Sequence, residues 1–448
     1  MNKTLLLLSL TAFFTSCGVK LDNARGLDVT YRDNSTGKAI ELEESKIFSI
    51  CEPSLEIMIS ASVFTGSEFK KIPYEVNTKL VPNVLYAGSI DLVESSIGVR
   101  GYRKDIIEKG KIFSVCLGAD YSTEASYESA VASSLYSFSK IHEDLKRLNI
   151  NLPPLTLRIA PKVTRTREYK EANKLVRESK TLINNAYYNF KEKEIVFLPQ
   201  GIPSNSGIIP FSGVAMWNIP FVSVHEYGHH LFASLFPNFV NDSQIRANVK
   251  FCFDNSHKHN NVELVTSNNK KKRVVGVKEV VTVINEAIAD MFARYLVDEQ
   301  ITMNNLGCLR KSRDVESKFF TSGATKRLSS KSLDKFFLTK AINTQNCYRE
   351  VNYQDPHMIG ASIAFMFDQI LTENKQTKDE KIQFIVSWIK ELNLKYYSYK
   401  YLDNKKVLEE MTLIGLDLAK NKFQLSQSKT CAIIGMNYPA LHHYYSCK

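Results

Sequence analysis

The chain has 448 residues, 44% of them hydrophobic, which is enough to bury more than one core. No two of its cysteines have Cys-x-x-Cys spacing, so a cysteine-based zinc finger is excluded. The formal net charge of +11 is typical of a solvated basic surface, or of one that faces anionic lipids or cell-surface polymers. We expect no nucleic-acid partner, and we find no motif that indicates an oligomeric state.

The first 17 residues are typical of a bacterial lipoprotein signal peptide. Lys3 precedes a short apolar run, and small residues then lead to Cys17. The run is too short for a stable transmembrane anchor, and no other run is apolar enough to span a membrane. We expect acylation of Cys17 and a lipid tether at the cell envelope, at the outer membrane in a Gram-negative host because Gly18 follows the cysteine. The alternative is cleavage near Cys17 and secretion.

Residues 18–118 are predicted to form a small β-rich accessory module. Strand-like runs occur at 55–59 and 89–93, with glycines scattered between them. No residue pattern in this module indicates a chemistry.

Export would allow disulfides among the remaining cysteines. Two pairs are expected, because similar apolar segments precede the first two cysteines and a short loop separates the last two: Cys51–Cys116 and Cys431–Cys447. The connectivity of the other three stays open: Cys252, Cys308 and Cys347.

Residues 119–448 are predicted to form the second domain. Helical spacing predicts a helix over 124–148, and alternation predicts a strand over 155–159. Later segments are mainly helical, at 359–371, 381–394 and 406–418. The fold class is therefore α+β, with a β-rich half, a helical half and a cleft between them in which a peptide could lie.

The pentapeptide His225-Glu226-Tyr227-Gly228-His229 follows Pro220, which suits the first turn of a helix. Residues i and i+4 lie on one face of a helix, so these two imidazoles can bind one metal ion. Glu226 lies beside the first ligand and can reach a water on the metal. The pentapeptide therefore indicates a zinc site.

A second segment has the carboxylates Glu286 and Asp290 at i, i+4 spacing beside the apolar stripe of an amphipathic helix. Two like charges there would repel unless something positive lies between them. A zinc ion and an imidazole would satisfy both, with Glu286 as third ligand and Asp290 accepting the N–H of a ligand histidine. For this pair taken alone, a solvated helix edge is the alternative.

Together these segments resemble the thermolysin-like (gluzincin) zinc metallopeptidases. By this resemblance, Asn185 and Ala186 belong to an edge strand that pairs with the substrate backbone. Arg310 would bind a substrate carbonyl, and His357 would stabilise the oxyanion. The resemblance assigns two further residues to hold the ligand imidazoles, Asn285 and Asp290. These motifs occur in the family's order.

The resemblance implies a zinc-dependent endopeptidase that acts on protein or peptide substrates. His225, His229 and Glu286 would bind one catalytic Zn²⁺ ion, and Glu226 would be the general base for a metal-activated water. The alternative is an envelope-anchored binding or scaffold lipoprotein with a zinc site but little turnover. Because pseudo-enzymes commonly lose the general base, the presence of Glu226 favours activity.

The chain departs from the family in three places. Between His229 and Glu286 lie 56 residues, a far longer gap than in thermolysin itself, and the surplus at 241–277 predicts a polar surface insertion. Phe221 stands where the family has a calcium-binding aspartate, so calcium is not expected. The tyrosine that assists oxyanion stabilisation has no clear counterpart, and Tyr353 is the candidate for its role.

Other metal sites and peptidase classes fit the sequence less well. His257 and His259 in the insertion could bind metal, but a His-x-His pair in a lysine-rich loop is more typical of solvated side chains. A metzincin would need a glycine and a third histidine where Phe232 and Leu235 stand. An aminopeptidase would need an acidic, glycine-rich strand before the zinc helix, which residues 214–218 do not provide.

Overall fold

The structure is a computed structural model of the chain. It describes residues 58–64, 69–75, 83–86, 89–95, 102–106, 127–159, 162–171, 174–183, 185–190, 192–199, 202–204, 207–209, 216–241, 264–267, 270–274, 277–297, 328, 333, 338–344, 347–351, 356–396, 404–442, 445 and 447. Several predicted features lie outside the described residues: the lipidation site Cys17, the Cys51–Cys116 pair, His257, His259, Arg310 and Tyr353.

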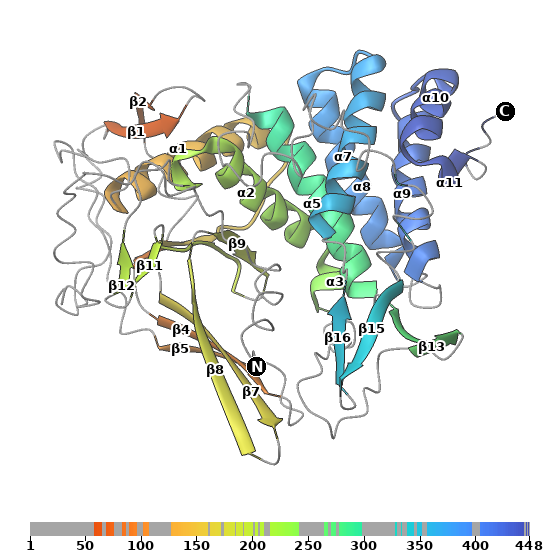
Figure 1. The fold of residues 1–448 in the computed structure, drawn as a ribbon. Coiled ribbons are helices and arrows are strands. Elements are labelled where there is room, and N and C mark those ends of the chain that lie inside the picture. The colour runs from red at the N-terminus through yellow and green to blue at the C-terminus, as the bar shows by residue number, and fades with distance from the viewer. Residues whose placement is uncertain are drawn as a thin grey trace.

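The fold is a mixture of helices and strands, as the sequence predicts (Figure 1). The strands are β1 (Met58–Phe64), β2 (Phe69–Glu75), β3 (Asn83–Tyr86), β4 (Ser89–Ser95), β5 (Tyr102–Ile106), β6 (Thr156–Ile159), β7 (Lys162–Glu171), β8 (Lys174–Leu182), β9 (Ala186–Asn189), β10 (Glu194–Phe197), β11 (Ile202–Ser204), β12 (Gly207–Ile209), β13 (Leu264–Ser267), β14 (Lys270–Val274), β15 (Leu338–Thr344) and β16 (Cys347–Val351). The helices are α1 (Tyr127–Arg147), α2 (Pro220–Leu235), α3 (Pro237–Asn241), α5 (Val277–Leu296), α7 (Pro356–Glu373), α8 (Lys378–Leu394), α9 (Asn404–Asn421), α10 (Gln427–Asn437) and α11 (Pro439–His442), with a 3-10 turn, η2, at Met216–Asn218.

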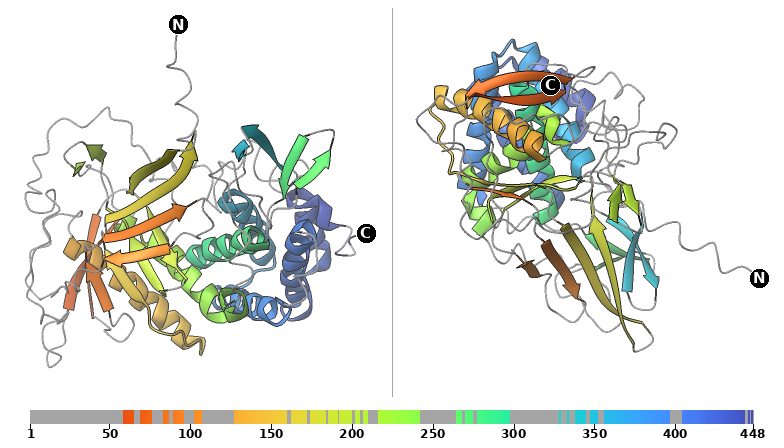
Figure 2. Two further views of the ribbon diagram at one scale, coloured as in Figure 1. Left: turned by 90° about the horizontal axis from the view of Figure 1, so that it is seen from below. Right: turned by 90° about the vertical axis from the view of Figure 1, so that its left-hand side faces the viewer.

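The sheet of β4, β5, β7 and β8 lies in a different part of the molecule from the C-terminal helices. Strands β4, β5, β7 and β8 lie at one end and helices α7 to α10 at the other, and both views of Figure 2 agree on this separation. The predicted helices over 124–148, 359–371, 381–394 and 406–418 are confirmed as α1, α7, α8 and α9. Their apolar positions recur with the helical period, which is why the sequence alone located them.

A four-stranded sheet in the order β3-β6-β10-β9 lies beside α1 and α2. Strands β3, β6 and β10 run parallel, and β9 is antiparallel to β10 at the edge of the described sheet. On one face Leu157, Ile195 and Phe197 join the main core, in which the two helices also take part. On the other face Val196 joins a small second cluster with Val163. Both faces of this sheet are therefore covered.

Three of the described strands before residue 118 belong to sheets that also contain later strands. Strand β3 pairs with β6, and β4 pairs with β7, so strands from residues 18–118 and from residues 119–448 are hydrogen-bonded neighbours in two sheets. Strand β5 pairs with β4, whereas β1 and β2 form a separate hairpin in which β1 contacts α1. The β-rich character predicted for this region agrees with its described strands. The predicted boundary at residue 118 does not separate the sheets, because strand pairing joins distant segments that local patterns cannot link.

The helical core forms around α5, which contacts α2, α7, α8 and α9. Most of its described apolar residues are buried, and the polar residues Asn285, Glu286 and Asp290 are buried on the same helix. Helix α2 begins at Pro220, the predicted first-turn proline, where the lost N–H costs no hydrogen bond. Helix α8 begins with a capping box, in which Thr377 and Glu380 satisfy each other's backbone N–H groups. Both starts are therefore encoded in a few adjacent residues.

Part of the predicted insertion is ordered into a sheet. Strands β13 and β14, both within 241–277, join β15 and β16 in an antiparallel four-stranded sheet. Residues 242–263 of the insertion lie outside the described residues. The insertion thus pairs with a hairpin that follows about 60 residues later in the sequence.

The predicted Cys431–Cys447 disulfide is confirmed, with an S–S distance of 2.03 Å. It joins α10 to the chain end, beyond α11. Among the described helices, none is long and apolar enough to cross a membrane.

Candidate metal centre

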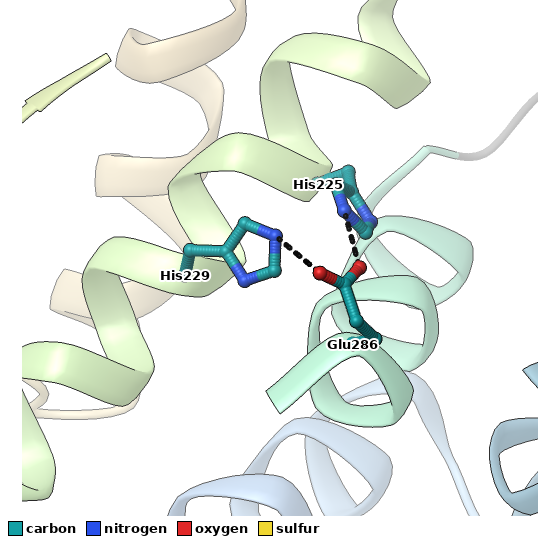
Figure 3. A group of neighbouring side chains, drawn as sticks. All are labelled: His225, His229 and Glu286. Carbon is teal, nitrogen blue, oxygen red and sulfur yellow. Dashed lines mark ion pairs between the residues drawn. The ribbon is translucent and has the colours of Figure 1, made fainter. Parts of the chain in front are cut away.

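Two packed helices bring the predicted metal ligands together. Helix α2 carries His225 and His229 one turn apart, and α5, which packs against it, carries Glu286. Figure 3 shows both imidazoles turned toward the Glu286 carboxylate. Nε2 of His225 lies 3.4 Å from Oε2 of Glu286, and Nε2 of His229 lies 3.7 Å from Oε1. One ligand atom from each residue lies within 4.8 Å of the other two.

These separations leave room for a metal ion among the three side chains. With metal–ligand bonds of about 2.0–2.2 Å, two ligands of a tetrahedral zinc ion lie about 3.3–3.6 Å apart. The observed distances of 3.4 and 3.7 Å, each to a different oxygen of Glu286, are close to that spacing. Two imidazole nitrogens and one carboxylate are also a donor set found in catalytic zinc sites. This group of residues can therefore hold a metal ion.

The charges at the site also fit a bound cation. Glu226 and Glu286 are each only 6% exposed, and Asp290 is fully buried. A solvated helix edge, the alternative for the Glu286 and Asp290 pair, is therefore excluded. Carboxylates buried this close together repel each other unless a cation or protons lie among them, and the cost of an uncompensated buried charge is several kcal/mol. A divalent cation would remove that cost.

The protonation state of His229 suits a metal ligand. Burial lowers the pKa of His229 below its ordinary value, an effect opposed by the nearby Glu286 carboxylate and assisted by His225. A ring whose pKa lies below 6.5 is mainly neutral at pH 7. The neutral imidazole is the form that coordinates metals.

Each ligand histidine has a polar partner on α5. Nδ1 of His225 lies 2.9 Å from Oδ1 of Asp290. Asn285 lies beside His229 and acts against the effect of burial on the His229 pKa, although its Oδ1 atom and the His229 Nδ1 atom make no regular hydrogen bond within the described part of the chain. Both partners are buried. A partner at the outer nitrogen orients an imidazole and leaves the other nitrogen for the metal.

Glu226, the predicted general base, lies on α2 next to His225 and is buried. Its Oε2 atom is buried and accepts no hydrogen bond from any group in the described part of the chain. A buried carboxylate oxygen without a donor costs about 1–3 kcal/mol or more, so such atoms are retained where a ligand or water supplies the donor. The Glu226 Oε2 atom can therefore accept a hydrogen bond or a proton from a water molecule or a substrate in the site.

His357, the predicted oxyanion residue, reaches the same site from a third helix. It lies in the first turn of α7, which packs against α5. Its Nε2 atom is 3.3 Å from Oε1 of Glu286, and its side chain is 40% exposed. The imidazole thus lies at the boundary between the buried ligands and solvent, where a substrate would meet them.

The predicted substrate strand, β9, is an edge strand that contacts α2. Leu198 N–H donates to the Asn185 carbonyl at 2.8 Å, which makes these two residues a hydrogen-bonded pair of the antiparallel ladder. Because such pairs alternate along a ladder, the backbone groups of Ala186 and Tyr188 point away from β10, toward the outer edge. Asn185 is exposed just before the strand. The edge therefore offers backbone donors and acceptors for an added strand.

A histidine that the sequence did not single out links this edge strand to α2. His230 is fully buried, and its Nε2 donates to the Pro153 carbonyl at 2.8 Å. Because a carbonyl only accepts, the proton is on Nε2, and Nδ1 accepts from the Tyr188 hydroxyl at 3.0 Å. Burial lowers the pKa of His230 to about 4, although the Pro153 hydrogen bond opposes this, so the ring is neutral. The adjacent histidines His229-His230 were the only sequence signal.

Phe221, the residue from which the sequence predicts no calcium site, packs one turn before His225 on α2. Its ring stacks on the His225 imidazole, with centroids 6.4 Å apart and an interplanar angle of 17°. An apolar ring offers no oxygen ligand to calcium. Phe221 therefore supports the orientation of the His225 ring on α2 through packing.

The structure brings together most of the residues that the sequence assigned to the site. These are His225, Glu226, His229, Asn285, Glu286, Asp290 and His357, with Asn185 and Ala186 at the nearby strand. Arg310, Tyr353 and Cys17 lie outside the described residues. No protein-family model matches the chain, and no curated protein matches it in sequence.

Proposed function

We propose that this protein is a zinc-dependent endopeptidase with a thermolysin-like arrangement of its site. One observation carries the proposal. The buried Glu226 carboxylate, whose Oε2 atom has no hydrogen-bond donor in the described part of the chain, lies next to His225, a member of the His225, His229 and Glu286 cluster. A purely structural metal site closes its ligand set and needs no adjacent base. A base beside an incomplete ligand set is the arrangement that hydrolysis requires.

The chemistry follows from which groups can move protons. When bound, a zinc ion supplies Lewis acidity, which polarises a carbonyl group and makes water more acidic. Glu226 accepts a proton from the attacking water and delivers it to the leaving amine. Asp290 and Asn285 hold the His225 and His229 rings in position. The first turn of α7 contributes His357, whose N–H donates to the oxyanion that develops on the substrate.

The substrate is a peptide or protein bound in extended form. The outward backbone groups of Ala186 and Tyr188 pair with its backbone as an added strand, and Asn185 donates or accepts beside them. Backbone pairing on both sides of the cleaved bond suits an endopeptidase. Arg310 is assigned to a substrate carbonyl by the family resemblance. One lobe built from the sheets and one from the helices, with the substrate between them, would complete the thermolysin-like fold.

The protein acts at the cell envelope, tethered by lipid on Cys17. The support is the short apolar run and the small residues before this cysteine. A lipid anchor would hold the peptidase at the membrane without a transmembrane helix. The tether is separate from the site, so either proposal can fail without the other.

The test is metal analysis and peptide cleavage by purified wild type beside Glu226→Gln. We expect one zinc ion per chain in both proteins, since neither the ligands nor their helix changes. Cleavage of an internally quenched peptide should fall about 10²–10⁴-fold in Glu226→Gln, because the amide cannot accept the water proton. Glu143→Gln, a change of the same chemistry at an exposed position on α1, should keep full activity.

The outcomes separate the two functional classes. A zinc-loaded wild type that cleaves neither peptides nor proteins would indicate a binding or scaffold lipoprotein. Equal activity in wild type and Glu226→Gln would show that another group is the base.

A further inference from the structure

A buried hydrogen-bonded bridge joins α2, which carries the two candidate histidine ligands, to the edge strand β9. His229 turns toward the Glu286 carboxylate, whereas the next residue, His230, contacts Tyr188 of β9 and the Pro153 carbonyl ahead of β6. Successive residues of a helix point about 100° apart, so two adjacent histidines can serve the metal and the strand separately. His229 thus contributes to the candidate metal site, and its neighbour His230 contacts β9 from the same turn of α2.

The bridge ends on the residue whose backbone is available for pairing. The Tyr188 side chain points into the core and meets His230, while its N–H and C=O point to the outer edge of the sheet. The ring packs against both Phe190 and His230, with centroids 5.2 and 5.5 Å away. Only one side of β9 has a strand partner among the described residues. The Tyr188 hydroxyl therefore restrains a strand that the ladder holds on one side only.

We propose that His230, acting through Tyr188, is a positioning residue that holds β9 at a set distance from the metal ligands. The inference rests on the proposed function, because it concerns where an extended peptide lies relative to the metal. The ligand that β9 recognises is the backbone of a peptide several residues long. A short substrate that does not span β9 gains nothing from the bridge. The effect therefore falls on binding of extended peptides more than on the chemical step.

Tyr188→Phe is the cleanest test, because it removes one hydroxyl and keeps the ring. Tyr445→Phe is the matched control: it removes a buried hydroxyl that donates to the Leu416 carbonyl of α9 at 3.1 Å. His230→Leu removes both hydrogen bonds, and His230→Gln restores one donor and one acceptor. If His230→Leu does not fold, Tyr188→Phe still decides the question.

Two measurements are made on the full-length protein loaded with zinc. The first is hydrogen exchange of the segment 185–190, which needs no catalysis. Tyr188→Phe should accelerate exchange in this segment, whereas Tyr445→Phe should not. The second is kinetics with a long and a short peptide that share the same cleaved bond. KM for the long peptide should rise about fivefold to tenfold in Tyr188→Phe, as expected for weakening of one hydrogen bond, with kcat and zinc content unchanged.

Partial recovery of KM in His230→Gln relative to His230→Leu would support positioning, because a merely structural loss would lower kcat and zinc content as well. Unchanged exchange in Tyr188→Phe would overturn the inference. So would faster exchange with no change in KM for the long peptide. If wild type cleaves nothing, the proposed function fails, and binding of the long peptide to each variant then replaces KM as the second measurement.

Discussion

Gly228 of α2 lies against the backbone of Ala289 of α5. A Cβ atom on Gly228 would lie 2.8 Å from the Ala289 Cα atom, closer than side chains and backbone approach in proteins. Gly360 of α7 meets α5 in the same way, 2.8 Å from the Glu286 Cβ atom. The three helices that carry the candidate site are therefore packed backbone to backbone. Their spacing sets the distance between the histidine pair and the Glu286 carboxylate.

Gly228→Ala should push α2 and α5 apart. We expect a loss of about 1–3 kcal/mol in the free energy of unfolding, typical of overpacking, and weaker zinc binding because the ligand atoms separate. Denaturant unfolding of the apo protein and competition with a zinc chelator measure the two effects. Gly435→Ala is the control. Gly435 lies on α10, far from the site in sequence, and a Cβ atom there would meet the His442 side chain at 3.3 Å. Unchanged zinc affinity in Gly228→Ala would contradict this account of helix spacing.

Glu286→Ala should lose zinc, because it removes one of the three candidate ligands. The loss of affinity should exceed the ~10–100-fold that follows from removing an outer partner of a ligand. Metal content after gel filtration in the presence of a weak chelator is the measurement, with Glu143→Ala as a control on the exposed face of α1. A Glu286→Ala protein that keeps a full zinc complement would point to another third ligand, such as His257, Glu263 or Glu279.

Asp290→Asn should weaken zinc binding without abolishing it. The amide no longer offers a negative charge to Nδ1 of His225, 2.9 Å away, so the ring becomes a poorer ligand. We expect a decrease in zinc affinity, or in activity at limiting zinc, of about 10–100-fold. Asp379→Asn, at a surface ion pair with Arg147, is the matched control. Equal affinity in wild type and Asp290→Asn would remove Asp290 from the site.

Cys17→Ser should abolish lipid attachment and leave catalysis unchanged. The residue lies in the predicted lipoprotein signal, where a thiol is the group that is acylated. Labelling with a fatty-acid analogue in the producing cells, followed by membrane fractionation, measures the effect. Cys431→Ser is not a suitable control, because that cysteine forms a disulfide with Cys447. Persistent labelling of Cys17→Ser would place the acyl group elsewhere.

The local signals in the sequence were sufficient for the helices and the metal ligands. Residues one turn apart on a helix are neighbours whatever the rest of the chain does, so His225 and His229 could be placed together from spacing alone. The carboxylates on α5 could be linked to them only through the family resemblance and the charge argument. The short-range Cys431–Cys447 pair was likewise predictable, since few residues separate the two cysteines.

Only the tertiary structure decided the features that join distant segments. Strand pairing of β3 with β6 and of β4 with β7 crosses the predicted boundary at residue 118, and nothing in either strand specifies its partner. The bridge from His230 to Tyr188 and Pro153 likewise depends on where a sheet lies against a helix. Sequence determines such contacts through the packing of the whole core, which periodicity and spacing do not report. Local patterns therefore identified the candidate metal ligands, and the fold alone revealed what holds the strand beside them.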